Sequence, residues 1–177
     1  MREVEMRLAQ LIISLGAGLF FASVTLAEQV CQGAKLTRPD SRYESGLGGL
    51  EVKDTVSGLI WRRCVEGLQW DGKQCAGEAI KVGLNEAQEL AKKAATATKR
   101  AWRLPTHAEM HSLAEKACKH PAINAKWFPE TPQAMHWSFL AEENNGKNPF
   151  LVDFASGEFA NWINKSPTNY VRLVRNP

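Results

Sequence analysis

The sequence predicts an α+β fold in which two helices pack on a small, mostly antiparallel sheet and long loops connect the elements. Three features support this prediction. Apolar residues recur at helical spacing in two segments, 86–99 and 106–119. Short runs rich in β-branched and aromatic residues lie before and after them, separated by turn-forming residues. Four cysteines follow an apolar N-terminal segment, as in exported domains that are stabilised by disulfides.

Residues 1–27 predict a signal peptide. Arg2 and Arg7 precede a run without charge at residues 8–26, and the small residue Ala27 marks the expected cleavage point. The run is about long enough to span a bilayer, so an uncleaved membrane anchor is the alternative. Glycines and serines within the run favour cleavage. We therefore expect a periplasmic or secreted protein that has left the membrane.

The charge of the chain is mildly basic. Cleavage after Ala27 removes two basic and two acidic residues, so the net charge stays at +3. This value is not typical of a nucleic-acid-binding domain, and we expect no nucleic-acid partner.

The first half of the remaining chain predicts a lead-in, a hairpin and a helix. Residues 28–49 are polar and glycine-rich, and we expect them to be irregular and to precede a domain at residues 50–177. Within it, residues 50–52 and 59–64 predict two strands joined by a turn. The next segment, 68–82, predicts a loop.

Asn85 is the expected cap of a helix over residues 86–99. Alanines and a leucine form a narrow apolar stripe on this helix, and Lys92 and Lys93 lie on the opposite side.

A corner between an extended segment and the second helix is the centre of the predicted fold. Trp102 and Leu104 lie two residues apart and face one side of the extended segment. Pro105 keeps Leu104 out of helical geometry. Thr106 can cap the following helix, and Glu109 can complete a capping box.

The second half of the chain predicts loops and strands. The second helix is expected to end near Lys119, and residues 121–132 predict a loop. Residues 135–140, 150–154 and 170–175 predict strands because apolar and aromatic residues dominate or alternate there.

The four cysteines predict two disulfides, although three pairings exist. Cys64 and Cys75 flank a short loop that contains glycines and an aspartate, so we expect them to pair. Cys31 would then pair with Cys118 and tie the N-terminal segment to the end of the second helix. A zinc site is the alternative, but the chain has no C-x-x-C motif.

A set of motifs is spread over residues 42–175. They are Arg42-Tyr43; Val52, Asp54, Ser57-Gly58-Leu59, Trp61 and Cys64; Trp70, Cys75 and Gly77; Trp102-Arg103-Leu104-Pro105-Thr106 and Glu109; Trp137-Ser138; and Val171-Arg172 with Val174-Arg175. Together they resemble the Lcl C-terminal domain family, named for a bacterial collagen-like adhesin. The fourth motif also resembles the formylglycine-generating sulfatase-modifying proteins. The resemblance implies a C-type-lectin-like fold whose long loops carry binding.

The resemblance implies an exported binding module for a surface glycan or an envelope protein. We expect the tryptophans Trp61, Trp102 and Trp137 to be buried, because they lie in predicted core segments. The expected exposed rings are those in predicted loops, Trp70, Trp127 and Trp162. The candidate ligand-binding residues are Trp70, Lys92, Lys93 and Trp162. An enzyme related to the formylglycine generators is one alternative, but those enzymes use cysteines near the end of the domain, and here none follows Cys118. A structural role in an envelope or pilus assembly is another.

No metal site is expected from the histidines. His107 and His111 flank Glu109 as H-x-E-x-H, which differs from the H-E-x-x-H order of metalloproteases. We therefore expect both to be exposed or to lie at the helix edge.

Calcium is the cofactor that the loop composition allows. The candidate oxygen ligands are Glu142, Glu143, Asn145 and Asp153. The lectin sugar motifs Glu-Pro-Asn and Trp-Asn-Asp are absent, and a solvated polar turn is the favoured interpretation.

Overall fold

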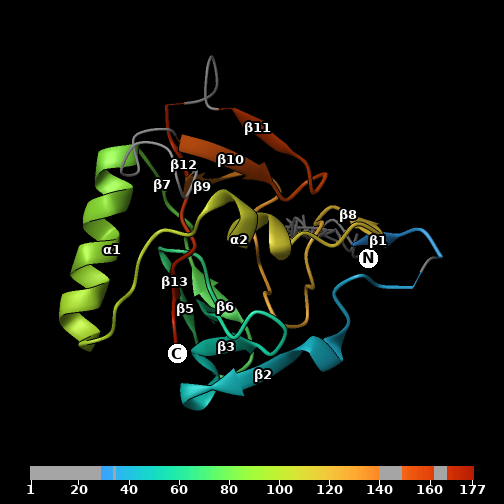
Figure 1. The fold of residues 1–177 in the computed structure, drawn as a ribbon, viewed down its shortest axis with the longest axis horizontal. Coiled ribbons are helices and arrows are strands. Elements are labelled where there is room, and N and C mark those ends of the chain that lie inside the picture. The colour runs from blue at the N-terminus through green and yellow to red at the C-terminus, as the bar shows by residue number, and fades with distance from the viewer. Residues whose placement is uncertain (1–28, 34, 140–148, 162–166) are drawn as a thin grey trace, which may run out of the picture.

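The computed structural model describes residues 29–33, 35–139, 149–161 and 167–177 (Figure 1). The expected signal peptide lies outside these residues. Within them, no helix has the length and apolar character needed to cross a bilayer. The fold of the described chain is α+β, as predicted, with two α-helices and several antiparallel sheets.

Short elements follow one another closely along the chain. In order they are β1 Val30–Cys31, the 3-10 helix η1 Asp40–Arg42, β2 Tyr43–Gly46, the 3-10 helix η2 Leu47–Gly49, β3 Glu51–Asp54, β4 Ile60–Arg62, β5 Leu68–Trp70, β6 Cys75–Gly77, β7 Lys81–Val82, α1 Leu84–Thr98, α2 His107–Ser112, β8 Cys118–Lys119, β9 Met135–Phe139, β10 Pro149–Asp153, β11 Phe159–Asn161, β12 Asn169–Tyr170 and β13 Val174–Arg175.

Two sheets form the body of the described chain. A five-stranded sheet has the order β11-β10-β9-β12-β7, and a four-stranded sheet has the order β13-β4-β3-β2. β1 with β8 and β5 with β6 make two further ribbons. The strands pair antiparallel, except β12 with β9. The mostly antiparallel pairing is confirmed, but the single small sheet that we expected is divided into several.

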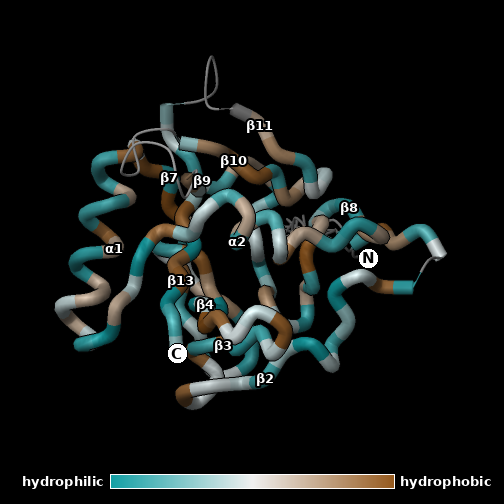
Figure 2. The backbone as a smooth tube through the Cα atoms, viewed as in Figure 1, coloured by the Kyte–Doolittle hydropathy of each residue, from teal (hydrophilic) through white to brown (hydrophobic). Residues whose placement is uncertain are grey.

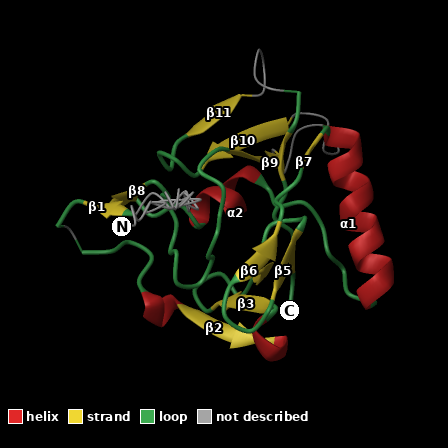
Figure 3. Ribbon diagram, turned by 180° about the vertical axis from the view of Figure 1, so that it is seen from behind, coloured by secondary structure: helices red, strands yellow, loops and turns green. Residues whose placement is uncertain are grey.

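Two clusters of buried side chains hold the elements together. One includes Trp61 and Met110 and joins the four-stranded sheet to α2. The other includes Trp102, Trp137 and Ala91 and joins α1 to the five-stranded sheet. The predicted burial of the three tryptophans is confirmed. Figure 2 shows hydrophobic segments around β7, β9 and β13 toward the middle of the molecule. Figure 3 shows α1 at one side and the β1–β8 ribbon at the other.

The predicted corner is confirmed in detail. Trp102, Leu104 and Pro105 are buried. Thr106 caps α2, since its hydroxyl accepts from the Glu109 amide while the Glu109 carboxylate accepts from the Thr106 amide. The Arg103 guanidinium donates to both oxygens of the same carboxylate at 2.7 Å. This fork-like pair fixes the extended segment against the first turn of α2.

The cap at the start of α1 and the end of α2 differ from the predictions. α1 is capped by Gly83 rather than Asn85, which is exposed within the helix. α2 ends at Ser112 rather than near Lys119. Its early end has a physical cause, because the chain turns there to bury Glu115, whose carboxylate accepts hydrogen bonds from the N-terminal segment.

Several strands were missed by the sequence prediction. Residues 28–49, expected to be irregular, contain β2, which pairs with β3. Residues 68–82, expected to be a loop, contain the β5–β6 hairpin and β7. Each has four residues or fewer, which is too short for an apolar alternation to mark it.

The expected C-terminal strand over 170–175 is interrupted. β12 belongs to the five-stranded sheet and β13 to the four-stranded sheet, so the chain changes sheets between them. Arg172 at the crossing is fully buried. Its guanidinium donates to the carbonyls of Arg62 and Arg63 and, at 2.7 Å, to the hydroxyl of Thr131. The segment between β12 and β13 is therefore linked through Arg172 to the end of β4 and to Thr131.

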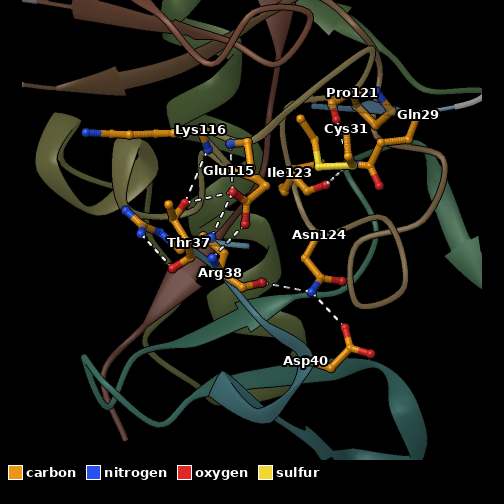
Figure 4. The surroundings of a disulfide bond; sticks show 12 residues. Gln29, Cys31, Thr37, Arg38, Asp40, Glu115, Lys116, Pro121, Ile123 and Asn124 are labelled. Carbon is orange, nitrogen blue, oxygen red and sulfur yellow. Dashed lines mark hydrogen bonds between the residues drawn. A yellow bond between two sulfur atoms is a disulfide. The ribbon is translucent and has the colours of Figure 1, made fainter. Parts of the chain in front are cut away.

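Both expected disulfides are present, Cys31–Cys118 and Cys64–Cys75. The first anchors the N-terminal segment (Figure 4). Close to it, Gln29 donates to two carbonyls of the 121–123 segment at 2.7 Å, and the buried Glu115 accepts from Thr37. Hydrogen bonds of this kind lower the pKa of Glu115, although burial opposes them. Paired cysteines are typical of proteins outside the reducing cytoplasm.

Candidate ligand-binding cleft

A cleft of about 330 Å³ lies where η2, the β3–β4 hairpin, β5 and the end of α1 meet. Its lining combines apolar and charged side chains. The lining residues are Leu47, Leu50, Glu51, Arg62, Cys64, Leu68, Gln69, Trp70, Thr98, Arg100 and Trp102. Leu47 and Leu50 are about half exposed, at 50% and 49%, and offer apolar surface to a ligand. An apolar surface with a few convergent polar groups is the usual composition of a ligand site.

Behind Trp70, which lines the cleft, an arginine packs against two indoles. The guanidinium carbon of Arg63 lies 4.6 Å from the centre of the Trp70 ring and 5.4 Å from that of Trp127. The same group donates to the Gly49 carbonyl and, at 3.1 Å, to that of Trp127. Burial lowers the pKa of Arg63. These contacts hold the Trp70 ring in a fixed orientation, with one face used by the arginine.

Three residues that line the cleft, Glu51, Arg62 and Arg100, form ion pairs. Glu51 is buried, and its two carboxylate oxygens accept from Arg100 at 2.6 Å and from Arg175 at 2.8 Å. Arg62 donates to Glu66 at 3.2 Å. Burial raises the pKa of Glu66, and the charge of Arg62 opposes that rise.

Arg62 and Arg100 keep donors for a ligand. Each side chain is about one-third exposed, at 31% and 34%, and each uses one terminal nitrogen in its ion pair. A guanidinium carries five N–H donors, so both retain hydrogen-bonding capacity toward the cleft. The ring of Trp102 packs beneath the Arg62 guanidinium, with 5.3 Å between its centre and the guanidinium carbon.

Only some of the predicted ligand-binding residues lie in this cleft. Trp70 lines it, although its ring is half-buried rather than exposed. Trp127 is also half-buried and packs against the core, so its predicted exposure is wrong. Trp162 lies outside the described residues.

The two lysines of α1 are exposed but separate from the cleft. Lys92 pairs with Glu89 at 2.7 Å on the helix surface and borders a second hollow near Trp102 and Phe139. Lys93 is exposed on the same helix, as predicted. Exposed pairs of this kind contribute little to stability.

Most of the predicted calcium ligands lie in a segment that the structure does not describe. Glu142, Glu143 and Asn145 lie outside the described residues. Asp153 is described, and its carboxylate accepts from the Ala155 amide at 2.9 Å, where it stabilises the turn after β10. Across the described ranges, no cluster of three or more histidine, cysteine or acidic residues is placed to hold a metal ion.

The sequence prediction missed Arg63 and Glu51. The alternation that places Trp61 toward the interior also places Arg63 there, and a buried arginine requires partners; this signal was present in the sequence. Glu51 had no such signal, since its partners are 49 and 124 residues away along the chain.

Comparison with known proteins gives one match. The family model of the Lcl C-terminal domain matches residues 50–175, which contain the whole cleft except Leu47. No curated protein and no solved structure matches the chain.

Proposed function

The chain belongs to the Lcl C-terminal domain family, and we propose that it is an exported binding module that recognises a surface glycan or an envelope protein. In this proposal residues 1–27 are a signal peptide, the mature protein is periplasmic or secreted, and the fold is C-type-lectin-like. The observation that carries the proposal is the cleft, in which exposed leucines and the Trp70 ring lie beside two guanidinium groups with spare donors.

The chemistry of the cleft suits a ligand with an apolar face and hydroxyl or acidic groups. Indole and leucine side chains offer flat apolar surface, and arginine donors orient oxygen atoms. The cleft walls are also held in place before any ligand arrives, by the Glu51 ion pairs and by the Cys64–Cys75 disulfide. A preformed site loses less entropy on binding.

The enzyme alternative has less support. All four cysteines are in disulfides, which leaves no thiol for chemistry of the formylglycine-generating type. The proposal of a binding module therefore needs no reaction and no cofactor. In this proposal the candidate calcium ligands stay Glu142, Glu143, Asn145 and Asp153, of which the first three lie outside the described residues.

A role in an envelope or pilus assembly is the second candidate. β2 is an edge strand of the four-stranded sheet, and Leu47 follows it directly at the border of the cleft. Edge strands offer unpaired backbone groups to a partner chain.

The test is a glycan array and a pull-down from envelope extract, each run with and without calcium. Leu50→Asp places a charge inside the cleft at an exposed position and is expected to abolish retention. Val56→Asp is the matched control, because Val56 is 75% exposed and does not line the cleft. Retention of an envelope protein without any glycan would favour the assembly role.

A second pair of substitutions separates the cleft from the helix surface. Lys92→Glu with Lys93→Glu reverses the charge on α1 and should leave binding unchanged at physiological salt. If this variant lost as much retention as Leu50→Asp, non-specific electrostatic attraction would be the cause of retention. Such attraction is screened over about 8 Å at that salt. Equal binding by Leu50→Asp and Val56→Asp would refute the cleft as the site.

A further inference from the structure

Two histidines on α2 lie side by side, away from the cleft. His107 and His111 are four residues apart, and their ring centres are 5.9 Å apart with planes tilted by 18°. Residues at this spacing share one face of a helix. Two imidazoles that bind one tetrahedral zinc ion through nitrogens at about 2.1 Å have ring centres about 5 Å apart. The rings are nearly parallel, so binding one ion between them requires both side chains to rotate.

The nitrogens of this pair are not used by the rest of the described chain. We find no hydrogen-bond partner for either ring among the described residues. Nδ1 of His107 is buried and unpartnered, so Nε2 is the nitrogen that this ring can offer to an ion. By contrast, His120 contacts Gln133 and His136 contacts the Ala134 carbonyl.

The pKa values of both imidazoles are lowered. Burial lowers the pKa of His107, and the neighbouring His111 lowers it further. Burial also lowers the pKa of His111, with smaller contributions from Lys116 and Arg38. Metal ions and protons compete for the same imidazole nitrogens, so binding is expected to depend on pH.

Two phenylalanine rings lie against the pair. The ring centre of Phe159 lies 4.9 Å from that of His107 and 5.7 Å from that of His111, and Phe150 lies 5.1 Å from His107. Apolar neighbours that fix ring orientation are a common outer layer of metal sites. Phe159 is itself 58% exposed, so the pair is close to solvent.

The charges nearby define what kind of ion fits. Glu109 is committed to Arg103 and Thr106, and no carboxylate joins the histidines. Arg38 and Lys116 act against any cation bound here, so binding must come from the bonds between imidazole and metal. Imidazole ligands favour copper, nickel and zinc over magnesium and calcium.

We propose that His107 and His111 form a two-imidazole binding site for a first-row transition-metal ion of the Cu²⁺, Ni²⁺ and Zn²⁺ group, with water completing the coordination. The site is independent of the cleft and of the proposed binding function. Two protein ligands beside two cations give modest affinity, strongest for Cu²⁺.

The test is calorimetric titration of the untagged mature protein with CuCl₂, NiCl₂ and ZnCl₂, one salt at a time. We expect one ion per chain, with binding lost as the pH falls below that at which the imidazoles protonate. His107→Asn and His111→Asn should each weaken binding at least about tenfold, since the loss even of an outer partner of a ligand has an effect of that size. His120→Asn is the matched control and should bind like the wild type.

A spectroscopic measurement keeps the test independent of how the variants fold. The electron paramagnetic resonance spectrum of the wild-type protein with one equivalent of Cu²⁺ should show coupling to imidazole nitrogens. Absence of that coupling, or no binding at millimolar metal ion, would overturn the proposal. Unchanged affinity in both α2 variants would overturn it too.

Discussion

A single glycine controls the wall of the cleft. Gly49 has a φ of +92°, and a Cβ at this position would overlap Nε1 of Trp70. Glycine is the residue that permits both the left-handed backbone and the close approach of the ring. The Trp70 ring can then lie against this backbone while Arg63 packs on it. The orientation of the Trp70 ring thus depends on Gly49 having no side chain.

Gly49→Ala is therefore expected to displace Trp70, to weaken cleft binding and to lower the free energy of unfolding by about 1–3 kcal/mol. Gly48→Ala is the matched control. Its φ is +65° and nothing lies within 4 Å of the added Cβ, so it carries backbone strain alone. Urea unfolding and tryptophan fluorescence measure the two variants. Equal spectra and equal stability loss would contradict a steric role for Gly49.

A buried histidine makes stability depend on pH. Burial lowers the pKa of His136 from 6.5 to about 3, helped by the charge of Arg172, while the hydrogen bond to the Ala134 carbonyl opposes the shift. The ring sits between Phe154 and Tyr170. The folded protein thus keeps His136 neutral in mild acid, whereas the unfolded chain binds a proton there below about pH 6.5.

The stability contributed by neutral His136 is complete above pH 6.5 and is lost as the pH falls toward 3, at about 1.4 kcal/mol per pH unit. His136→Asn retains a donor for the Ala134 carbonyl but has no titrating ring. We expect its free energy of unfolding to decline less steeply between pH 6.5 and 4.5. Urea unfolding at several pH values measures both proteins, and parallel curves would refute the assignment.

At the scale of elements, sequence patterns predicted the parts of the fold that are stabilised by interactions between residues close together in the chain. The Trp102–Glu109 corner was predictable because proline geometry, a capping box and apolar spacing all act within eight residues. The β3–β4 hairpin was predictable for the same reason, from an Asp-to-Gly turn between apolar runs. These elements also contain most of the motifs that resemble the family.

Elements that depend on contacts with residues far away in the sequence were not predictable. β2 exists because it pairs with β3, and α2 stops at Ser112 because Glu115 is needed by the N-terminal segment. The break in the C-terminal strand follows from the burial of Arg172 between the sheets. The cleft shares this property: Trp70 was identified from its position in a loop, but Glu51 gains its role from arginines far along the chain.

At the scale of the whole molecule, two disulfides act on different regions. Cys31–Cys118 joins residues 87 positions apart and holds the N-terminal segment against the segment that follows α2. Cys64–Cys75 joins residues 11 positions apart, and Cys64 lines the cleft. The hairpin of β5 and β6 carries both Trp70 and Cys75, so the second disulfide restrains the cleft wall directly. The two cross-links therefore restrain different parts of the described chain, and only Cys64–Cys75 adjoins the cleft.

Removing each cross-link should separate these effects. In the loop-entropy model, Cys31→Ser with Cys118→Ser lowers the free energy of unfolding by about 4–5 kcal/mol, and Cys64→Ser with Cys75→Ser by about 3 kcal/mol. Ligand retention should show the opposite order, because only the second change releases the hairpin that carries Trp70. Urea unfolding and retention on the ligand identified by the array give both quantities for each variant. If the variant without Cys31–Cys118 lost retention while still folded, the N-terminal segment would have to be part of the binding surface.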